Sequence, residues 1–385
     1  MAGAAGGGDA RLGRVVFADQ LRGVAALLVV LSHMFNVYPF AQPLVSALTA
    51  APPVQLPWTW MNTVMTQPWV NFGPFRVGLF FLVSGFVIPF SLRRHSRGTF
   101  LMARLLRIYP TYWAALALGS AAVAASAAYW GLPRPFGRVQ LLGNATLMHT
   151  LTHLPTIDAV NWTLVVELHF YLFAALARPW ILRCSLWPMA AAAGGAGALL
   201  LAQGAGWVHR PSPLDIEAMS LAFMLTGTAV HYHFAGGLRT GALAAVAAGL
   251  GVVFLGLFAT SPATRGDAVA AVSYGWALAA FLAAYAFRAV LPDLAPLRLL
   301  ARISYPLYAV HFLLGLAGMT WLIAGPAGLG YGAAAWTVLA LLLLVAWGLH
   351  LGVERWTIRW GAALGRQAAK RADAEVRTSA APGTV

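Results

Sequence analysis

Charged residues are scarce in this sequence: Asp, Glu, Lys and Arg make up 9% of 385 residues, whereas a soluble domain carries about 25%. This scarcity excludes a soluble globular enzyme. Apolar residues reach 60%, which excludes a disordered chain, and their long runs do not fit the alternating strands of an outer-membrane barrel. The one cysteine, Cys184, excludes an intramolecular disulfide and a cysteine-based metal cluster.

Long apolar runs are what the sequence has instead. A bilayer core needs about 20 mostly apolar residues per helix. Ten segments meet this length: 17–37, 72–92, 108–130, 160–182, 186–206, 217–235, 241–259, 268–290, 303–324 and 332–353. We therefore predict an all-α fold, a polytopic membrane bundle of about ten transmembrane helices that forms one domain over residues 17–353.

The basic residues indicate how this bundle is oriented. The net charge is +14, and the basic residues flank apolar runs instead of lining one face, so no nucleic-acid partner is expected. With the N-terminus in the cytoplasm, 20 basic residues fall on the inner side and five on the outer side. The positive-inside rule therefore predicts that both termini are cytoplasmic. Membrane lipid is the surrounding partner.

Three segments are expected to lie outside the membrane. Residues 1–16 form a flexible, Gly- and Ala-rich N-terminus, and residues 38–69, rich in Pro and Trp, form an outer loop. Residues 354–385 form a cytoplasmic basic tail, disordered from 364 onward. No soluble domain is expected to be appended.

Polar residues within the spans are candidates for function because charges in a bilayer are costly. Glu167 is the one acidic residue well inside a span. Arg22 and His33 are eleven residues apart and so share one stripe of the first helix, with Asp19 one turn before Arg22 as an ion-pair partner. We expect His33 at the depth of Glu167, where a carboxylate could hold the tautomer of a proton-shuttling imidazole. The alternative is that Arg22 reaches the headgroups and His33 makes a bundle contact.

Two arginines precede the third span. Arg104 and Arg107 are three residues apart and therefore adjacent on a helical face, where their guanidinium groups could bind phosphate oxygens. The same arginines could instead anchor the chain to anionic lipid.

Further polar residues are predicted to line the interior of the bundle. Ser304, Tyr308 and His311 form a polar stripe on the ninth helix, and Ser84 lies in mid-span. We expect Ser84, Tyr308 and His311 to line a pore, although such a serine can also bond a backbone carbonyl one turn back. The pairs His149/His153 and His231/His233 have metal-like spacing but no nearby cysteines or acids, so no metal is expected.

Five motifs in a fixed order resemble one known family. They are DQLRGVAALLVVLSH, GLFFLVSGF, RLLRIYPTYW, NWTLVVELHFY and ISYPLYAVH. In this combination the chain resembles the acyltransferase-3 family, ten-helix proteins of the bacterial cytoplasmic membrane. These enzymes transfer acyl groups, usually acetyl, from CoA to hydroxyls of surface glycans or glycosylated natural products. Some relatives carry an additional extracytoplasmic esterase-like domain.

The resemblance implies roles for individual residues. The family's Arg-x10-His motif falls on Arg22 and His33, its Arg-x2-Arg motif on Arg104 and Arg107, and its Trp-[Ser/Thr]-Leu-x-x-Glu motif on residues 162–167, with Thr163 where many members have Ser. Acyl-CoA is then the co-substrate and a glycan or glycosylated small molecule the acceptor.

The expected mechanism assigns catalysis to His33, Glu167 and Arg22. His33 is the general base, Glu167 orients it, Arg22 lies near the thioester arm, and Arg104 and Arg107 hold the CoA phosphates. Transfer can be direct or proceed through an acyl-histidine. Two other classes stay open: a proton-coupled secondary transporter using Arg22, His33 and Glu167 as a relay, and a non-catalytic scaffold. The transporter predicts broken helices or an inverted repeat, and the scaffold needs no polar stripe.

Overall fold

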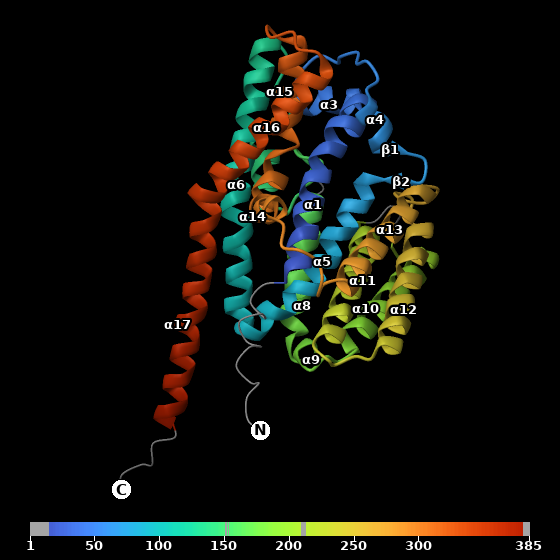
Figure 1. Cartoon of the computed structure of the whole chain (residues 1–385), viewed down its shortest axis with the longest axis vertical. Helices are drawn as coiled ribbons and strands as arrows, with labels where there is room; N and C mark the ends of the chain where they lie inside the picture. The colour runs from blue at the N-terminus through green and yellow to red at the C-terminus, as the bar shows by residue number, and fades with distance from the viewer. Residues whose placement is uncertain (1–14, 151, 153, 209–212, 380–385) are drawn as a thin grey trace.

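The computed structural model describes residues 15–150, 152, 154–208 and 213–379, and this part of the chain is almost entirely helical (Figure 1). Its strands are two short segments, β1 (Thr66–Gln67) and β2 (Val70–Asn71), which pair as an antiparallel hairpin. The helical segments are α1 (Val16–Ser32), η2 (His33–Val37), α2 (Tyr38–Phe40), α3 (Gln42–Thr49), α4 (Trp60–Met65), α5 (Phe72–Arg94), α6 (Arg97–Trp130), α7 (Arg138–Ala145), α8 (Trp162–Leu176), α9 (Arg178–Leu182), α10 (Trp187–Gly204), α11 (Pro213–Phe234), α12 (Thr240–Thr260), α13 (Ala268–Ala286), α14 (Ala295–Val310), α15 (Leu313–Ala324), α16 (Tyr331–Leu349), η3 (His350–Glu354) and α17 (Arg355–Ser379).

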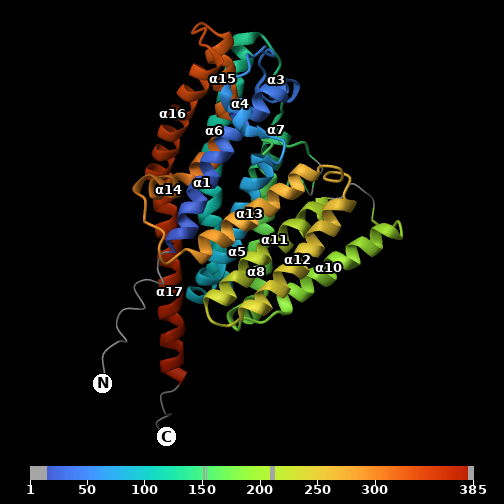
Figure 2. The same ribbon diagram turned by 45° about the vertical axis from the view of Figure 1, so that its right-hand side comes forward.

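Helices α1 and α5 run through the middle of the bundle. In Figure 1, α6 and α14–α17 lie on one side of them and α10–α13 on the other, and Figure 2 shows α14, α16 and α17 to the left and α10 and α12 to the right. Helix α1 packs against α14 and α5, and α5 also packs against α11 and α13. This arrangement brings α1, α5, α6, α8 and α14 around a common interior, although they are far apart in the sequence.

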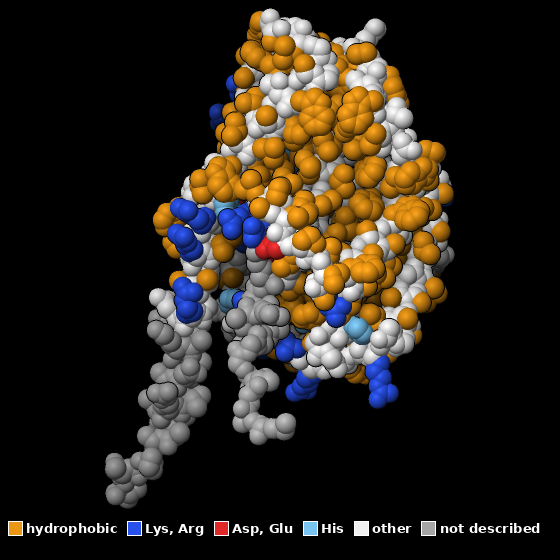
Figure 3. Space-filling model, viewed as in Figure 1, with side chains coloured by type: hydrophobic (Ala, Val, Ile, Leu, Met, Phe, Trp, Pro, Cys, Tyr) orange, Lys and Arg blue, Asp and Glu red, His pale blue; other side chains and the backbone are white. Residues whose placement is uncertain are grey.

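The structure supports a multi-pass membrane protein. All ten expected segments lie on helices, and six helices among the described residues are long and apolar enough to cross a membrane. A seventh span results if α14 and α15, which are bent by 73° at their junction, count as one. Figure 3 shows hydrophobic side chains over most of one face, as a lipid-facing surface requires. The number ten and the cytoplasmic termini remain predictions.

Several expected boundaries were wrong. The third span begins at Arg97 instead of near residue 108, because the Ser96 side chain accepts the Thr99 N–H and caps a continuous helix that carries Arg104 and Arg107. The tail expected to be disordered from 364 is helical to Ser379. The loop at 38–69 contains the short helices α2–α4. Most of the expected flexible N-terminus, residues 1–14, lies outside the described residues.

Two glycines let α5 and α11 approach each other closely. A Cβ added at Gly85 would lie 1.8 Å from the carbonyl oxygen of Met224, and one at Gly227 would lie 2.2 Å from that of Leu82. Small residues permit such backbone contact between membrane helices, where hydrophobic burial alone gives little driving force. The Thr228 hydroxyl also donates to the Gly85 carbonyl at 3.1 Å.

We predict that Gly85→Ala disrupts this packing. The methyl group must push α11 away, at a cost at or above the upper end of the about 1–3 kcal/mol typical of overpacking. Thermal unfolding in detergent should show a marked loss of stability. Gly251→Ala on α12 is the control because its added Cβ meets nothing within 4 Å. Equal stability of both variants would contradict the close contact.

Candidate functional site

A cavity lined by three arginines lies in the centre of the bundle, and we call it the arginine cavity. About 870 Å³ of space that atoms do not fill lies between its walls, including the open mouth of the cavity. Five helices contribute to its wall. The lining residues are Arg22, Val77, Phe80, Phe81, Val83, Ser84, Val87, Ile88, Arg104, Arg107, Ile108, Thr163, Leu164, Glu167, Tyr171, Ser304, Tyr305 and Tyr308.

Arg104 and Arg107 reach the cavity from one turn of α6. The Nη2 of Arg104 donates to the Ser91 hydroxyl at 2.6 Å, and its guanidinium lies 5.5 Å and 5.6 Å from the ring centroids of Phe100 and Tyr171. The side chain of Arg107 makes no hydrogen bond or ion pair with any other residue that the structure describes. Arg104 is therefore held in place. The N–H groups of Arg107 face the cavity and can donate hydrogen bonds to an anion there.

Glu167 faces the arginine cavity from α8. Its Oε1 accepts from the Tyr171 hydroxyl at 2.5 Å and from the Ser84 hydroxyl at 3.3 Å. The expected pairing of Glu167 with His33 is wrong, because both ring nitrogens of His33 have other partners and the two residues line different cavities. Sequence reasoning missed Tyr171, which follows Glu167 by four residues and so shares its helical face.

Arg22 lies at the cavity wall near the start of α1. Its Nη2 donates to Asp19 Oδ1 at 3.3 Å, which confirms the expected ion pair. Among the residues that line the cavity, three arginines from α1 and α6 accompany one carboxylate, that of Glu167. The wall itself is therefore cationic, and such a lining suits an anionic ligand.

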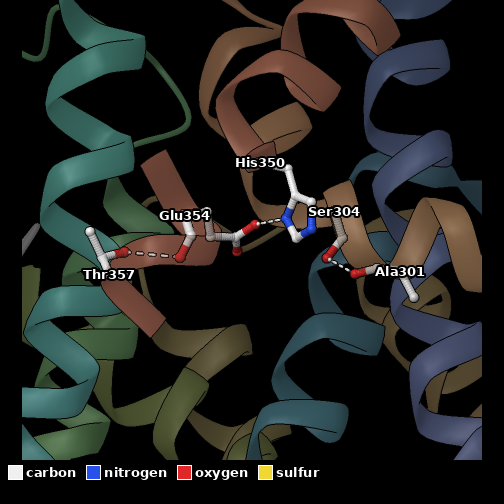
Figure 4. Close-up of polar contacts among 5 residues, drawn as sticks. All are labelled: Ala301, Ser304, His350, Glu354 and Thr357. Carbon is white, nitrogen blue, oxygen red and sulfur yellow. Dashed lines mark hydrogen bonds and ion pairs between the residues drawn. The ribbon is translucent and has the colours of Figure 1, made fainter. Parts of the chain in front are cut away.

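A second carboxylate lies behind these arginines. Figure 4 shows Glu354 and His350 on η3, close to Ser304 on α14. Glu354 is 2% exposed, and its Oε2 bonds His350 Nδ1 at 2.7 Å. Its charge acts on both Arg107 and Arg22. Sequence reasoning did not select Glu354, because only the fold shows that this part of the chain is buried against the cavity wall.

A second cavity contains His33, and we call it the histidine cavity. It is lined by His33, Gly73, Pro74, Arg76, Val77, Ala159, Val160, Trp162, Thr163, Tyr274 and Tyr308. Arg76 Nη2 lies 3.0 Å from His33 Nε2, and His33 Nδ1 lies 2.7 Å from His311 Nε2. His311 Nδ1 in turn lies 2.6 Å from the Tyr308 carbonyl oxygen.

These contacts fix the positions of the protons. A guanidinium can only donate and a carbonyl can only accept, so His33 Nε2 is unprotonated and His311 Nδ1 carries a proton. With His311 neutral, its Nε2 must accept, and the proton of His33 is therefore on Nδ1. One directed chain runs from Arg76 through His33 and His311 to the Tyr308 carbonyl.

Arg76 was missed as a site residue. Sequence reasoning counted it among the five basic residues on the outer side. It lies inside α5, is 6% exposed, and its Nε has no partner in the part of the chain that the structure describes. The rule that charges within a span are functional candidates would have found it. His311 was expected to line a pore but instead contacts His33 directly.

A thin wall separates the two cavities. Val77, Thr163 and Tyr308 line both of them. The hydroxyls of Thr163 and Tyr308 are 2.5 Å apart, and Tyr308 Oη also donates to the Val160 carbonyl at 2.8 Å. Of the residues expected in a pore, Ser84 lines the arginine cavity and Tyr308 lies in this wall.

A buried carboxyl group lies in the turn before α8. It belongs to Asp158, and burial raises its pKa to about 7.

No group of three or more His, Cys, Asp or Glu side chains that could hold a metal ion occurs among the described residues. His153, one of the histidines with metal-like spacing, lies outside them. His231 Nδ1 instead bonds the Phe86 carbonyl, and His233 bonds Tyr285 and Thr240. In the described chain these two histidines serve helix packing.

Comparison with known proteins identifies the family. A family model described as an acyltransferase domain, of the acyltransferase-3 type, matches residues 15–351. No curated protein and no solved structure gives a significant match. The matched region includes α1 through α16 and therefore every residue that lines the two cavities. Because the match covers most of the chain and both cavities, this protein belongs to the acyltransferase-3 family.

Proposed function

We propose that the protein is a membrane O-acyltransferase of the bacterial cytoplasmic membrane, with both termini in the cytoplasm. It transfers an acyl group, which we expect to be acetyl, from acyl-CoA to a hydroxyl of a sugar-containing acceptor. The acceptor is a surface polysaccharide, a lipid-linked glycan or a glycosylated natural product. The observation that carries the proposal is the arginine cavity, suited to an anionic donor, which shares a wall with a cavity containing a candidate base.

The donor binds in the arginine cavity. Arg107, with its unengaged donors, and Arg104 hold phosphate oxygens of CoA, and Arg22 lies along the thioester arm. The apolar side chains of α5 line the rest of the wall and accommodate the pantetheine chain. The acyl group then points toward Tyr308 and Thr163, and these side chains must separate for it to meet the acceptor.

The acceptor hydroxyl binds in the histidine cavity. Trp162 and Tyr274 offer flat apolar faces there to a sugar ring. The hydroxyl replaces the Arg76 N–H at His33 Nε2 and gives its proton to that nitrogen as its oxygen attacks the thioester carbonyl. The carbon–sulfur bond breaks, and the CoA thiolate regains a proton. Direct transfer of this kind needs no acyl-enzyme.

Glu167 has a role on the donor side. It fixes the Tyr171 hydroxyl and balances part of the positive charge of Arg104 and Arg107. The depth of Glu167 in its helix suggested a position next to His33, but its carboxylate lies elsewhere. We therefore assign Glu167 to shaping the donor site and not to orienting the base.

Donor binding can be tested with two matched double variants. Arg104 and Arg107 replaced together by Gln should weaken acetyl-CoA binding by about tenfold or more for each arginine, since a charge-assisted hydrogen bond contributes about 1.5–3 kcal/mol. Isothermal titration of the purified protein in nanodiscs measures this change.

Arg93 and Arg94 replaced by Gln form the control. Both lie in the last turn of α5, are exposed, and line neither cavity. Their loss should leave affinity for acetyl-CoA within about twofold. If both double variants weaken binding equally, the arginines attract the donor only through general charge, and the assigned phosphate site is wrong.

One observation favours the second candidate, a proton-coupled transporter. Helices α14 and α15 form a broken pair bent by 73°, a feature common at transporter substrate sites. The two functions differ in their ligands. An acyltransferase gains thermal stability from acetyl-CoA in a saturable way and moves radiolabelled acetyl groups to a methyl glycoside. A transporter shows neither effect and instead moves protons across liposome membranes.

A further inference from the structure

We propose that His311 accepts the Nδ1 proton of His33 during transfer, so that the two histidines act as a proton relay. The inference rests on the proposed function, in which His33 is the base. His311 does not touch the reacting atoms and acts through His33. It is a positioning residue that also stores a proton.

The position of Arg76 gives the first argument. If His33 took the hydroxyl proton and kept both of its protons, it would be an imidazolium with the Arg76 guanidinium 3.0 Å from its Nε2 in the structure. Both groups are nearly enclosed by protein, where repulsion between like charges is screened far less than in water. Moving the charge away from Arg76 lowers this repulsion, which falls with distance.

The contact with His311 gives the charge a route. His33 already donates its Nδ1 proton to His311 Nε2 at 2.7 Å, and the two rings lie edge to edge, with 25° between their planes and centroids 4.9 Å apart. When His33 Nε2 gains the hydroxyl proton, the Nδ1 proton passes to His311 Nε2. His33 is then neutral again, and the positive charge lies one ring farther from Arg76.

One contact of His311 stabilises this charge. Its Nδ1 proton is held by the Tyr308 carbonyl, which in a continuous helix would accept from the Phe312 N–H. The bend between α14 and α15 leaves this carbonyl to the side chain. The other ionisable groups near the pair are Arg76 on α5, Tyr308 on α14 and Tyr274 on α13. The carbonyl dipole thus stabilises an imidazolium at His311 and offsets part of the cost of burying its charge.

The proton balance closes over one turnover. The hydroxyl proton enters at His33 Nε2, and the Nδ1 proton moves to His311. After the oxygen–carbon bond forms and the carbon–sulfur bond breaks, the relay runs backward and His33 Nε2 gives a proton to the CoA thiolate. The products are the ester and CoA thiol, and both histidines end as they began.

The test uses His311→Gln, because a glutamine Oε1 can take the place of His311 Nε2 as acceptor. This variant keeps the hydrogen bond that holds the tautomer of His33 but cannot receive a proton. Transfer from radiolabelled acetyl-CoA to methyl glycosides is measured, using the glycoside that the wild type acetylates fastest. We expect kcat to fall at least about tenfold while the Kd for acetyl-CoA is unchanged.

Single-turnover rates in mixtures of H₂O and D₂O provide a second readout, which also applies if His311→Gln does not fold. If two protons move in the rate-limiting step, the rate plotted against the deuterium fraction gives a curve. If one proton moves, the plot is a straight line. We expect a curve for the wild type and a line for His311→Gln. Full activity of the variant, or a straight line for the wild type, overturns the relay. If the wild-type protein neither binds acetyl-CoA nor transfers acetyl groups, the proposed function itself is wrong.

Discussion

His33→Gln is expected to lower acyl transfer by about 100- to 10,000-fold, the range over which a general base accelerates a reaction. Glutamine suits this test because its amide oxygen can still accept from Arg76, so the buried guanidinium keeps a partner. An amide cannot take a proton from the acceptor hydroxyl. The protein should therefore fold, insert and bind acetyl-CoA normally, and the rate of acetyl transfer to a methyl glycoside measures the loss.

His231→Gln is the matched control for His33→Gln. His231 is also a buried histidine in the bundle, 2% exposed, but its Nδ1 bonds the Phe86 carbonyl and it lines neither cavity. Its replacement should lower thermal stability somewhat and leave transfer unchanged. Wild-type transfer by correctly folded His33→Gln protein would remove His33 from the mechanism, whatever its place in the structure.

The sequence predicted the residues of the arginine cavity well. Arg22, Ser84 and Glu167 were selected because polar groups within apolar spans must face a protein interior, and Arg104 and Arg107 because their spacing places them side by side on one helical face. All five line this cavity. The reasoning needs only composition and helical spacing, which are local properties. It does not depend on knowing which helices are neighbours.

The partners of these residues could not be predicted in the same way. Counting residues from the start of α8 gives the depth of Glu167 in a membrane but not the direction in which its side chain points. The rotation of α8 against α5 and α6 turns Glu167 toward Ser84 and the arginines, away from His33. The contact between His33 and His311, 278 residues apart, likewise depends on the bend after α14.

Arg76→Gln is expected to lower kcat by about 100- to 1,000-fold, as the loss of one group that stabilises an oxyanion does in other enzymes. The acceptor hydroxyl must reach His33 Nε2, which lies 3.0 Å from Arg76 Nη2 in the structure. The thioester carbonyl, on which negative charge develops, is then within reach of the guanidinium. Because burial removes most of the water around Arg76, its charge acts strongly on that oxygen.

The choice of glutamine separates the charge of Arg76 from its hydrogen bond. A glutamine amide can donate toward His33 Nε2 and keep the tautomer, so the expected loss reports the missing charge. Arg265→Gln is the control because Arg265 is exposed and lines neither cavity. Steady-state kinetics with acetyl-CoA and a methyl glycoside measure both variants. If Arg76→Gln raises only the KM for the glycoside, Arg76 binds the acceptor and does not stabilise the oxyanion, because only charge that develops in the transition state changes kcat.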